Sequence, residues 1–236
     1  MKYLGFDIEV CSWPEDNNWD RKTPLGVSCI GLMGTDWDKP EVYYASSCSG
    51  SPEPRAMNEL ELKHFVSDLV HYNDEYIITS WNGLQFDFLV MALDHPEEVR
   101  AYAYFALNHI DPMFEIFCTK GWPVGLNAVA KGLGLPGKLS DGVSGADAPK
   151  MWMEGTKEDR ELVLEYVGQD AKTTVDIVDV GTRLEKLYWR SKSGRPQSIP
   201  YKNPRTCTEC LQIPEPDNSW MDNPLERKGF YDWTGL

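Results

Sequence analysis

The sequence predicts an α/β fold in which helices cover both faces of a mixed β-sheet. Three apolar, β-prone segments come first, joined by loops rich in Gly, Pro, Asp and Asn, so they form an antiparallel meander. An amphipathic helical pattern precedes the fourth strand, which is therefore expected to lie parallel to the first. Helical segments then dominate the chain to about residue 190, as in a sheet covered on both faces.

Four strands are expected, at residues 2–10, 25–33, 41–46 and 75–80. The first reads K-Y-L-G-F-D-I-E-V and is apolar except at its charged positions. Residues 11–24, rich in Trp, Asp, Asn and Pro, are interpreted as a surface loop.

Helices are expected at residues 58–72, 84–93, 96–108, 112–120, 125–133 and 156–190. The last begins near Thr156, with Glu158 and Asp159 in its first turn, where acidic side chains suit the helix dipole. Residues 136–149 are rich in Gly, Ser and Asp and are interpreted as a loop.

The composition is acidic, with 23 basic and 37 acidic residues and a net charge of −14. This argues against a general nucleic-acid coat protein, but it leaves open an enzyme that holds cations and touches a nucleic acid locally. The six scattered cysteines are expected to be reduced thiols. With a strand beginning at residue 2 and no apolar run near ~18 residues, we expect a soluble, intracellular, cytoplasmic protein without a signal peptide or membrane span.

Asp7 and Glu9 lie two positions apart on the first strand, so both side chains point to the same face. Two adjacent carboxylates on a core strand are costly to hold ionised without a partner. A hard divalent cation such as Mg²⁺ or Mn²⁺ prefers carboxylate oxygens and would be such a partner. The alternative is that the pair lies at an exposed strand end without a role.

Three further residues add to this pattern. Asp87 follows the turn at residues 81–83, where the fourth strand ends and a helix begins, a place where α/β proteins build sites. Tyr166 and Asp170 are four apart on the last helix and share one face. The alternatives are a half-buried aromatic residue for Tyr166 and a surface charge for Asp170.

Together these residues resemble the motifs of the DEDD family of 3′–5′ exonucleases, the DnaQ-like branch of the ribonuclease H-like superfamily. The motifs are F-D-I-E-V with Asp7 and Glu9, W-N-G-L-Q-F-D-F with Asp87, and Y-V-G-Q-D-A with Tyr166 and Asp170. The tyrosine resembles that of the tyrosine (DEDDy) subgroup, because the histidine subgroup would need His where this chain has Glu165. The second motif and G-L-N-A-V-A-K-G-L-G-L-P-G-K look most like the proofreading domain of family-B DNA polymerases.

The resemblance implies a ribonuclease H-like fold with a mixed five-stranded sheet, an antiparallel meander plus parallel strands. It covers residues 1–190, an exonuclease domain, and leaves residues 191–236 as a tail that packs on the domain or on a partner, such as a replication or repair protein. It also implies two divalent cations, Mg²⁺ or Mn²⁺. Asp7 would bridge both, Glu9 and Asp170 would complete the water-activating site, Asp87 would support the second cation, and Tyr166 would position the water.

Substrate contacts are expected from four residues, Val10, Asn82, Phe86 and Lys138. For Asn82 and Phe86, the resemblance to the polymerase proofreading domain implies contact with the terminal nucleotides. Val10 would offer its backbone N–H to a terminal 3′-OH, and Lys138 would reach a phosphate. The alternatives are a turn residue for Asn82, a core residue for Phe86 and a solvated side chain for Lys138. Residues 183–205 carry seven basic side chains and one acidic one, so a single strand would be drawn there unless the segment is simply solvated.

The sequence therefore favours a metal-dependent 3′–5′ exonuclease that cuts single-stranded DNA 3′ ends and releases nucleoside monophosphates. An RNA 3′ exonuclease and a non-catalytic binding module on the same fold are the alternatives. In the tail, Cys207-x-x-Cys210 suggests a zinc site, yet no second pair of ligands follows. Thr206-x-x-Glu209 reads equally as a capping box, which would place both cysteines on a short helix.

Overall fold

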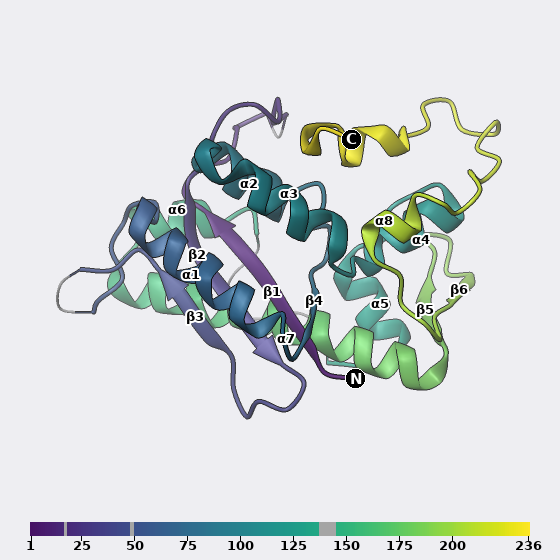
Figure 1. Cartoon of the computed structure of the whole chain (residues 1–236), viewed down its shortest axis with the longest axis horizontal. Helices are drawn as coiled ribbons and strands as arrows, with labels where there is room; N and C mark the ends of the chain where they lie inside the picture. Colours follow the sequence, from purple (N-terminus) through teal and green to yellow (C-terminus); the bar gives the residue numbers. More distant parts are fainter. Residues whose placement is uncertain (17, 48–49, 137–144) are drawn as a thin grey trace.

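The computed structural model describes residues 1–16, 18–47, 50–136 and 145–236. Its central sheet, in the order β3-β2-β1-β4, consists of β1 (Tyr3–Val10), β2 (Val27–Gly34), β3 (Glu41–Tyr44) and β4 (Ile77–Thr79). β1 is antiparallel to β2 and parallel to β4, and β2 is antiparallel to β3 (Figure 1). The predicted meander and the parallel fourth strand are confirmed.

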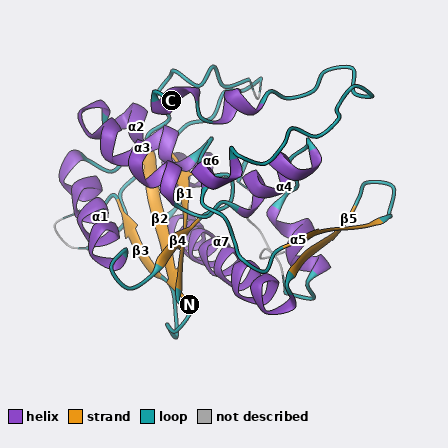
Figure 2. Ribbon diagram, turned by 45° about the vertical axis from the view of Figure 1, so that its right-hand side comes forward, coloured by secondary structure: helices purple, strands orange, loops and turns teal. Residues whose placement is uncertain are grey.

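The helices are α1 (Glu59–Tyr72), α2 (Asp87–Asp94), α3 (Val99–Asn108), α4 (Pro112–Lys120), α5 (Leu126–Gly132), α6 (Ala148–Glu154), α7 (Lys157–Leu184) and α8 (Cys207–Cys210). Short 3₁₀ turns lie at Pro96–Glu98, Arg227–Phe230 and Asp232–Thr234. The long helix α7 lies along one face of the sheet, and α1 and α2 lie on the other (Figures 1 and 2). The predicted class, a mixed sheet flanked by helices, is confirmed.

The two faces of β1 are built differently. On one face Phe6 packs against Phe65 of α1 and Phe88 of α2, with ring centroids 6.0 and 4.9 Å apart. On the other face Gly5 meets α7, where an added Cβ would lie 2.7 Å from the carbonyl oxygen of Ala171. Because side chains alternate along a strand, Asp7 and Glu9 share the face of Gly5 and therefore look toward α7.

A glycine on β2 also lets α7 approach the sheet closely. Gly31 pairs with Asp7, and a Cβ on Gly31 would lie 2.5 Å from the carbonyl oxygen of Val167. A side chain at Gly5 or Gly31 would hold the helix away from the sheet. These two glycines let the backbone of α7 lie directly on β1 and β2.

The fifth strand is reduced to one residue in the described part of the chain. Ile110 forms a single parallel bridge with Thr79, and its N–H donates to the carbonyl of Ile78 at 3.0 Å. Helix α3 ends at Asn108 and Asp111 caps α4, so the chain stays extended only briefly. The sheet thus has four strands where five were expected.

The last long helix was predicted to run to residue 190, and this is wrong. α7 ends at Leu184, and Glu185 takes a left-handed conformation with φ 55°. The chain then forms β5 (Lys186–Arg190), antiparallel to β6 (Pro196–Pro200). Within β5 only Leu187 and Trp189 are buried, which is the alternation of a strand rather than a helix. Helix α6 was also not predicted, because its first residues were assigned to a loop.

The tail after β6 contacts the rest of the chain. Helix α8 has the predicted capping box of Thr206 and Glu209, and it carries Cys207 and Cys210. The ring of Phe230 lies tilted against that of Phe117, with centroids 4.3 Å apart. All five described cysteines are free thiols.

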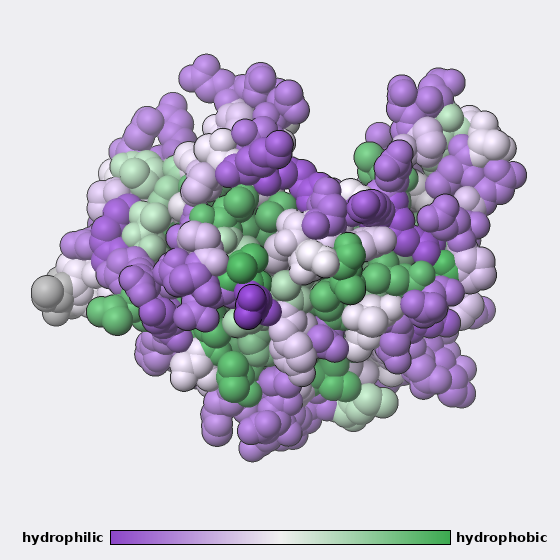
Figure 3. All heavy atoms as spheres, turned by 45° about the horizontal axis from the view of Figure 1, so that its top comes forward, coloured by the Kyte–Doolittle hydropathy of each residue, from purple (hydrophilic) through white to green (hydrophobic). Residues whose placement is uncertain are grey.

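The molecular surface is mainly polar on the side shown in Figure 3, with apolar side chains exposed in separate groups. That face is hollowed between two projections at its upper edge. Among the described residues, no helix combines the length and the apolar character needed to cross a bilayer.

Candidate active site

A cavity of about 340 Å³ lies at the C-terminal end of β1. Four of the five predicted catalytic side chains line it: Asp7, Glu9, Tyr166 and Asp170. The remaining described lining is formed by Ile8, Val10, Trp13, Phe86, Gly145 and Ala146. Residues more than 150 positions apart in the chain therefore meet around one small space.

The packing of α7 explains this convergence. Tyr166 and Asp170 lie one turn apart and flank Val167, the residue that touches Gly31. Since Gly31 pairs with Asp7, the same contact sets both helix side chains beside the carboxylates of β1. Tyr166 and Asp170 are each only 2 % exposed. Their positions are thus fixed by backbone contact, which suits a site that needs defined geometry.

Asp87 is attached to β1 by a hydrogen bond. It begins α2, is 2 % exposed, and accepts a hydrogen bond from the backbone N–H of Ile8 at 3.2 Å. Burial, together with the charge of Asp111, raises the pKa of Asp87 to about 8. Asp87 does not line the cavity itself. Because a backbone N–H of a strand lies in the plane of the sheet, the bond to Ile8 places Asp87 beside β1, at the position between Asp7 and Glu9.

The four predicted substrate contacts are placed differently. Val10 and Phe86 line the cavity, whereas Asn82 does not. Asn82 sits in the turn after β4 with φ 69°, and its N–H donates to Asp111 at 3.0 Å. Its predicted contact with a nucleotide stays a prediction. Lys138 lies outside the described residues.

The chain was compared with known proteins at the level of sequence profiles and of solved structures. A profile described as the RNase_H superfamily matches residues 20–181, which is more than half of the chain. The chain belongs to the ribonuclease H superfamily. The matched range includes Asp87, Tyr166 and Asp170 but begins after β1 with its two carboxylates. No curated protein matches the sequence of this ribonuclease H superfamily member.

Two solved structures illustrate the likeness. The family-B DNA polymerase of the hyperthermophilic archaeon Pyrobaculum calidifontis has a TM-score of 0.54 and 19 % identity, over 76 % of this chain and 24 % of the polymerase. E. coli exonuclease I in complex with a dT13 oligonucleotide has a TM-score of 0.37 and 14 % identity, over 77 % of this chain and 41 % of that one. The chain thus spans less than half the length of either protein, and the first likeness supports the ribonuclease H-like fold.

Sequence reasoning missed four residues of the cavity wall, namely Ile8, Trp13, Gly145 and Ala146. The most informative of them is Trp13. It lies in the loop after β1 and forms an aromatic cluster with Trp19 and Phe86, with centroids 5.8 to 6.3 Å apart. The signal was present as two tryptophans in an otherwise polar loop. Such large apolar rings are seldom placed in a loop without a packing or binding role.

Two other groups of described residues could hold a metal by proximity alone. His109, Asp111 and Cys207 are buried, with ligand atoms within 4.8 Å of one another. Each His109 ring nitrogen already has a partner, the Ala106 carbonyl at 2.8 Å and the Ser80 hydroxyl at 2.9 Å. Asp111 accepts hydrogen bonds from the backbone N–H groups of Asn82 and Leu84, in the turn after β4, and of Phe114 in the first turn of α4. This ribonuclease H-like chain therefore uses the first group as a structural hydrogen-bond network, and Cys210 is not part of it.

The second group lies at the start of α1 and consists of Glu59, His95 and Glu97. The Nε2 atom of His95 is 3.5 Å from a carboxylate oxygen of Glu97, and both glutamates are exposed. Exposed acidic pairs beside a histidine are common without a metal, and none of these residues lines the carboxylate cavity.

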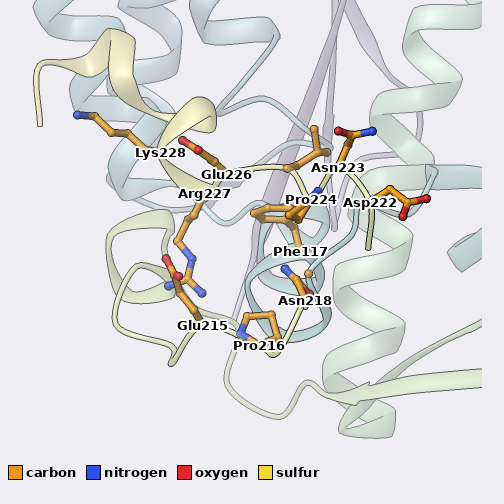
Figure 4. A pocket seen from close by; sticks show the side chains of 12 residues that line it. Phe117, Glu215, Pro216, Asn218, Asp222, Asn223, Pro224, Glu226, Arg227 and Lys228 are labelled. Atoms are coloured by element: carbon orange, nitrogen blue, oxygen red, sulfur yellow. The ribbon is translucent and has the colours of Figure 1, made fainter. Parts of the chain in front are cut away.

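A larger cavity of about 620 Å³ lies between α4 and the tail (Figure 4). Arg227 occupies one side of it and donates to the carbonyl oxygens of Cys118, Leu211 and Ile213. The bond to Cys118 attaches the tail to the end of α4, and the other two lie within the tail. The cavity thus follows from how the tail packs, and it does not share the carboxylate arrangement at the end of β1.

Proposed function

We propose that this chain is a metal-dependent 3′–5′ exonuclease of the tyrosine (DEDDy) subgroup, in the DnaQ-like branch. It would hydrolyse phosphodiester bonds from the 3′ end of single-stranded DNA and release nucleoside monophosphates. The observation that supports this is the convergence of Asp7, Glu9, Tyr166 and Asp170 on one cavity, with Asp87 hydrogen-bonded to β1 at Ile8.

The donor set fits hard divalent cations. Asp7, Glu9, Asp87 and Asp170 offer only carboxylate oxygens, which Mg²⁺ and Mn²⁺ prefer. Glu9, Asp87 and Asp170 are 7 %, 2 % and 2 % exposed, and carboxylates this buried are costly to ionise without compensation. These four residues would hold two such cations, which supply an activated water and stabilise charge on the attacking and leaving oxygens.

The residues of the chain would then position the reactants. Tyr166 lines the cavity, and its hydroxyl would orient the attacking water by a hydrogen bond. Val10 can present its backbone N–H to a terminal 3′-OH, and Phe86 with Trp13 offers an aromatic wall to a base.

The size of the cavity supports an unpaired substrate end. At about 340 Å³ it is near the lower limit of small-ligand sites, which have volumes of roughly 300–1,000 Å³. A duplex is much wider than such a space. We therefore propose that only a frayed or single strand places its terminal nucleotide beside the carboxylates.

The exonuclease domain is proposed to span residues 1–190. Residues 191–236 would be a tail that packs on it, as the Phe230 contacts support, and that could also bind a replication or repair protein. An RNA 3′ exonuclease uses the same cation chemistry and is the second candidate. A non-catalytic binding module would have no need of three carboxylates around one cavity and a fourth bonded to the same strand.

One assay separates these candidates. DNA and RNA oligonucleotides labelled at the 5′ end are incubated with Mg²⁺, Mn²⁺ or EDTA. We expect a descending ladder of DNA products with either cation and intact substrate in EDTA. A ladder from RNA alone would support the second candidate, and binding without cleavage under all conditions would support the module.

A further inference from the structure

The β5–β6 hairpin is basic in an acidic protein. Residues 186–200 contain the cations Lys186, Arg190, Lys192 and Arg195 and no acidic side chain, although the whole chain has a net charge of −14. Local charge of one sign against the overall balance indicates a surface that meets a ligand of the opposite charge.

The charges of the hairpin are not neutralised within the described chain. Cations on either side of the hairpin form ion pairs, Arg183 with Asp179 at 2.9 Å and Lys202 with Glu185 at 2.7 Å. Among the described residues, the four hairpin cations have no such pair, and neither does Lys131 on the adjacent helix α5. Five cations gathered without acidic partners repel one another, so binding a polyanion would relieve that repulsion.

The outer face of β5 alternates cation and aromatic ring. Lys186, Tyr188 and Arg190 occupy every second position and are exposed, while Leu187 and Trp189 point inward and are buried. The ring of Tyr188 is 37 % exposed between two cations. A stacking surface beside phosphate-binding cations is the pattern by which proteins hold single-stranded nucleic acid without reading its sequence.

A groove of about 750 Å³ runs between this hairpin and α5. Its lining includes Lys131, Tyr188, Arg190 and Gln197. Helix α5 lies directly on the strand at Gly132, where an added Cβ would be 1.9 Å from the carbonyl oxygen of Tyr188. The two walls of the groove are therefore held together by backbone contact.

We propose that the β5–β6 hairpin and Lys131 form a second binding site, which holds single-stranded DNA at a distance from the carboxylate cavity. The hairpin follows the far end of α7 (Figures 1 and 2). The stretch of α7 from Asp170 to Leu184 is about 21 Å long at ~1.5 Å per residue, so only a longer oligonucleotide reaches both sites. That the bound segment lies 5′ to the scissile bond rests on the proposed exonuclease function.

Binding is tested first, without catalysis. The probe is a fluorescent oligothymidylate of about 16 nucleotides, with the full chain in EDTA and anisotropy as the readout. We expect Lys131→Ala/Lys186→Ala/Arg190→Ala to weaken binding at least about tenfold and to lower the slope of log K against log[salt] by roughly 2–3. Tyr188→Ala should weaken binding about tenfold with an unchanged salt slope. Thermal unfolding of each variant verifies its fold.

A matched variant controls for net charge. Lys2→Ala/Lys63→Ala/Arg100→Ala removes the same charge from exposed positions on other parts of the surface and should change the affinity less than about twofold. Equal weakening by both triple variants, or no weakening by the hairpin variant, would overturn the proposal. Polyglutamate that binds as tightly as DNA and is released by the same substitutions would make the ligand an acidic protein and would also overturn it.

Cleavage then distinguishes the two proposals. If the hairpin holds the distal strand, the hairpin variant should cleave a dinucleotide at the wild-type rate and should show a raised KM on the longer oligonucleotide. Hairpin-dependent binding without any nuclease activity would refute the proposed function and leave the second site standing. If the chain is a nuclease but the hairpin variant binds and cleaves the longer oligonucleotide with unchanged affinity and KM, the second site is refuted and the proposed function stands.

Discussion

The carboxylate of Asp87 accepts a hydrogen bond from the backbone N–H of Ile8, with 3.2 Å between oxygen and nitrogen. Ile8 lies between Asp7 and Glu9, so this bond connects the start of α2 with the strand that carries two further carboxylates. From the other side, Val167 of α7 touches Gly31, which pairs with Asp7. Two distant segments of the chain are thus joined to β1 and β2, one through the Asp87 carboxylate and one through the backbone of Val167. These contacts place the candidate side chains Asp7, Glu9, Asp87, Tyr166 and Asp170.

Replacing Asp7 should remove activity and keep the fold. Asp7→Ala takes away a carboxylate at the centre of the proposed cation site, and cation catalysis contributes several kcal/mol, so we expect the rate to fall by roughly three orders of magnitude or more. Asp7 lines the cavity rather than the apolar core, so the melting temperature should not fall appreciably. Single-turnover cleavage in Mg²⁺ measures the effect, with the surface variant Asp74→Ala as control. A wild-type rate in Asp7→Ala would refute the assignment of Asp7 to the cation site.

Replacing Tyr166 by phenylalanine should slow the reaction moderately. The hydroxyl is assigned to a water molecule, so its loss misplaces the nucleophile and should cost roughly 10–100-fold in rate. Cation binding, measured by calorimetry with Mn²⁺, should stay the same. Loss of cation affinity, or an unchanged rate, would show that the role given to the hydroxyl is wrong.

A single methyl group at Gly31 should disturb both stability and activity. In Gly31→Ala the new Cβ would lie 2.5 Å from the backbone oxygen of Val167, so α7 must move away from the sheet. Overpacking of this kind costs about 1–3 kcal/mol, and the displaced helix carries Tyr166 and Asp170. Chemical denaturation and cleavage assays measure the two effects. Gly229→Ala, where nothing lies within 4 Å of the new Cβ, should change neither.

The sequence predicted the sheet well because its periodicity is strong there. The segments at Tyr3–Val10 and Val27–Gly34 are nearly continuous apolar runs, and helix α4 lies within the bounds expected for it. The end of α7 was missed because Lys186–Arg190 has both helix-forming residues and a strand alternation, and the decisive event is the left-handed turn at Glu185. Such a turn depends on the packing of Leu187 and Trp189, which a local pattern does not display.

Periodicity also explains why part of the candidate site was predicted. The spacing of Asp7 and Glu9 on a strand, and of Tyr166 and Asp170 on a helix, places each pair on one face. These four residues could therefore be predicted from the sequence. No local pattern shows that Gly31 sets the distance between them. Trp13 was missed because its place in the cavity depends on how a loop folds back, and loops have no periodicity from which to read it.

Stability should depend on pH through a buried glutamate away from the cavity. Glu115 is 1 % exposed and pairs with Arg205 at 2.7 Å, and burial raises its pKa to about 7 from an ordinary value of 4.5. The folded chain therefore binds more protons than the unfolded chain between those values, so this contribution to stability is lost as pH rises from about 4.5 to 7.

Glu115→Gln should flatten that part of the profile, by at most about 3 kcal/mol across the window. Raised pKa values of Asp87 and Asp111 act with the same sign and remain in the variant, so the slope should shrink rather than vanish. Melting temperatures of the metal-free chain across this pH range measure it. The exposed variant Glu75→Gln should keep the wild-type slope, and a Glu115→Gln profile parallel to the wild type would contradict the assignment.

Cleavage should run from 3′ to 5′ and should require an unpaired end. This expectation follows from the proposed site, in which Val10 meets the terminal 3′-OH and Phe86 with Trp13 accepts a splayed base. Stacking of one base on an aromatic ring contributes about 1–3 kcal/mol, which is comparable to the free energy of fraying one base pair. A blunt duplex should therefore be cut more slowly than a single strand, and a duplex with a mismatched 3′ end at an intermediate rate.

A 3′ phosphate should also slow the reaction, because it removes the hydroxyl that Val10 would recognise. Strands labelled at either end distinguish the direction of attack. Mononucleotides released first from the 5′ end, or equal rates on blunt duplex and single strand, would refute this substrate geometry and would leave the carboxylate site standing.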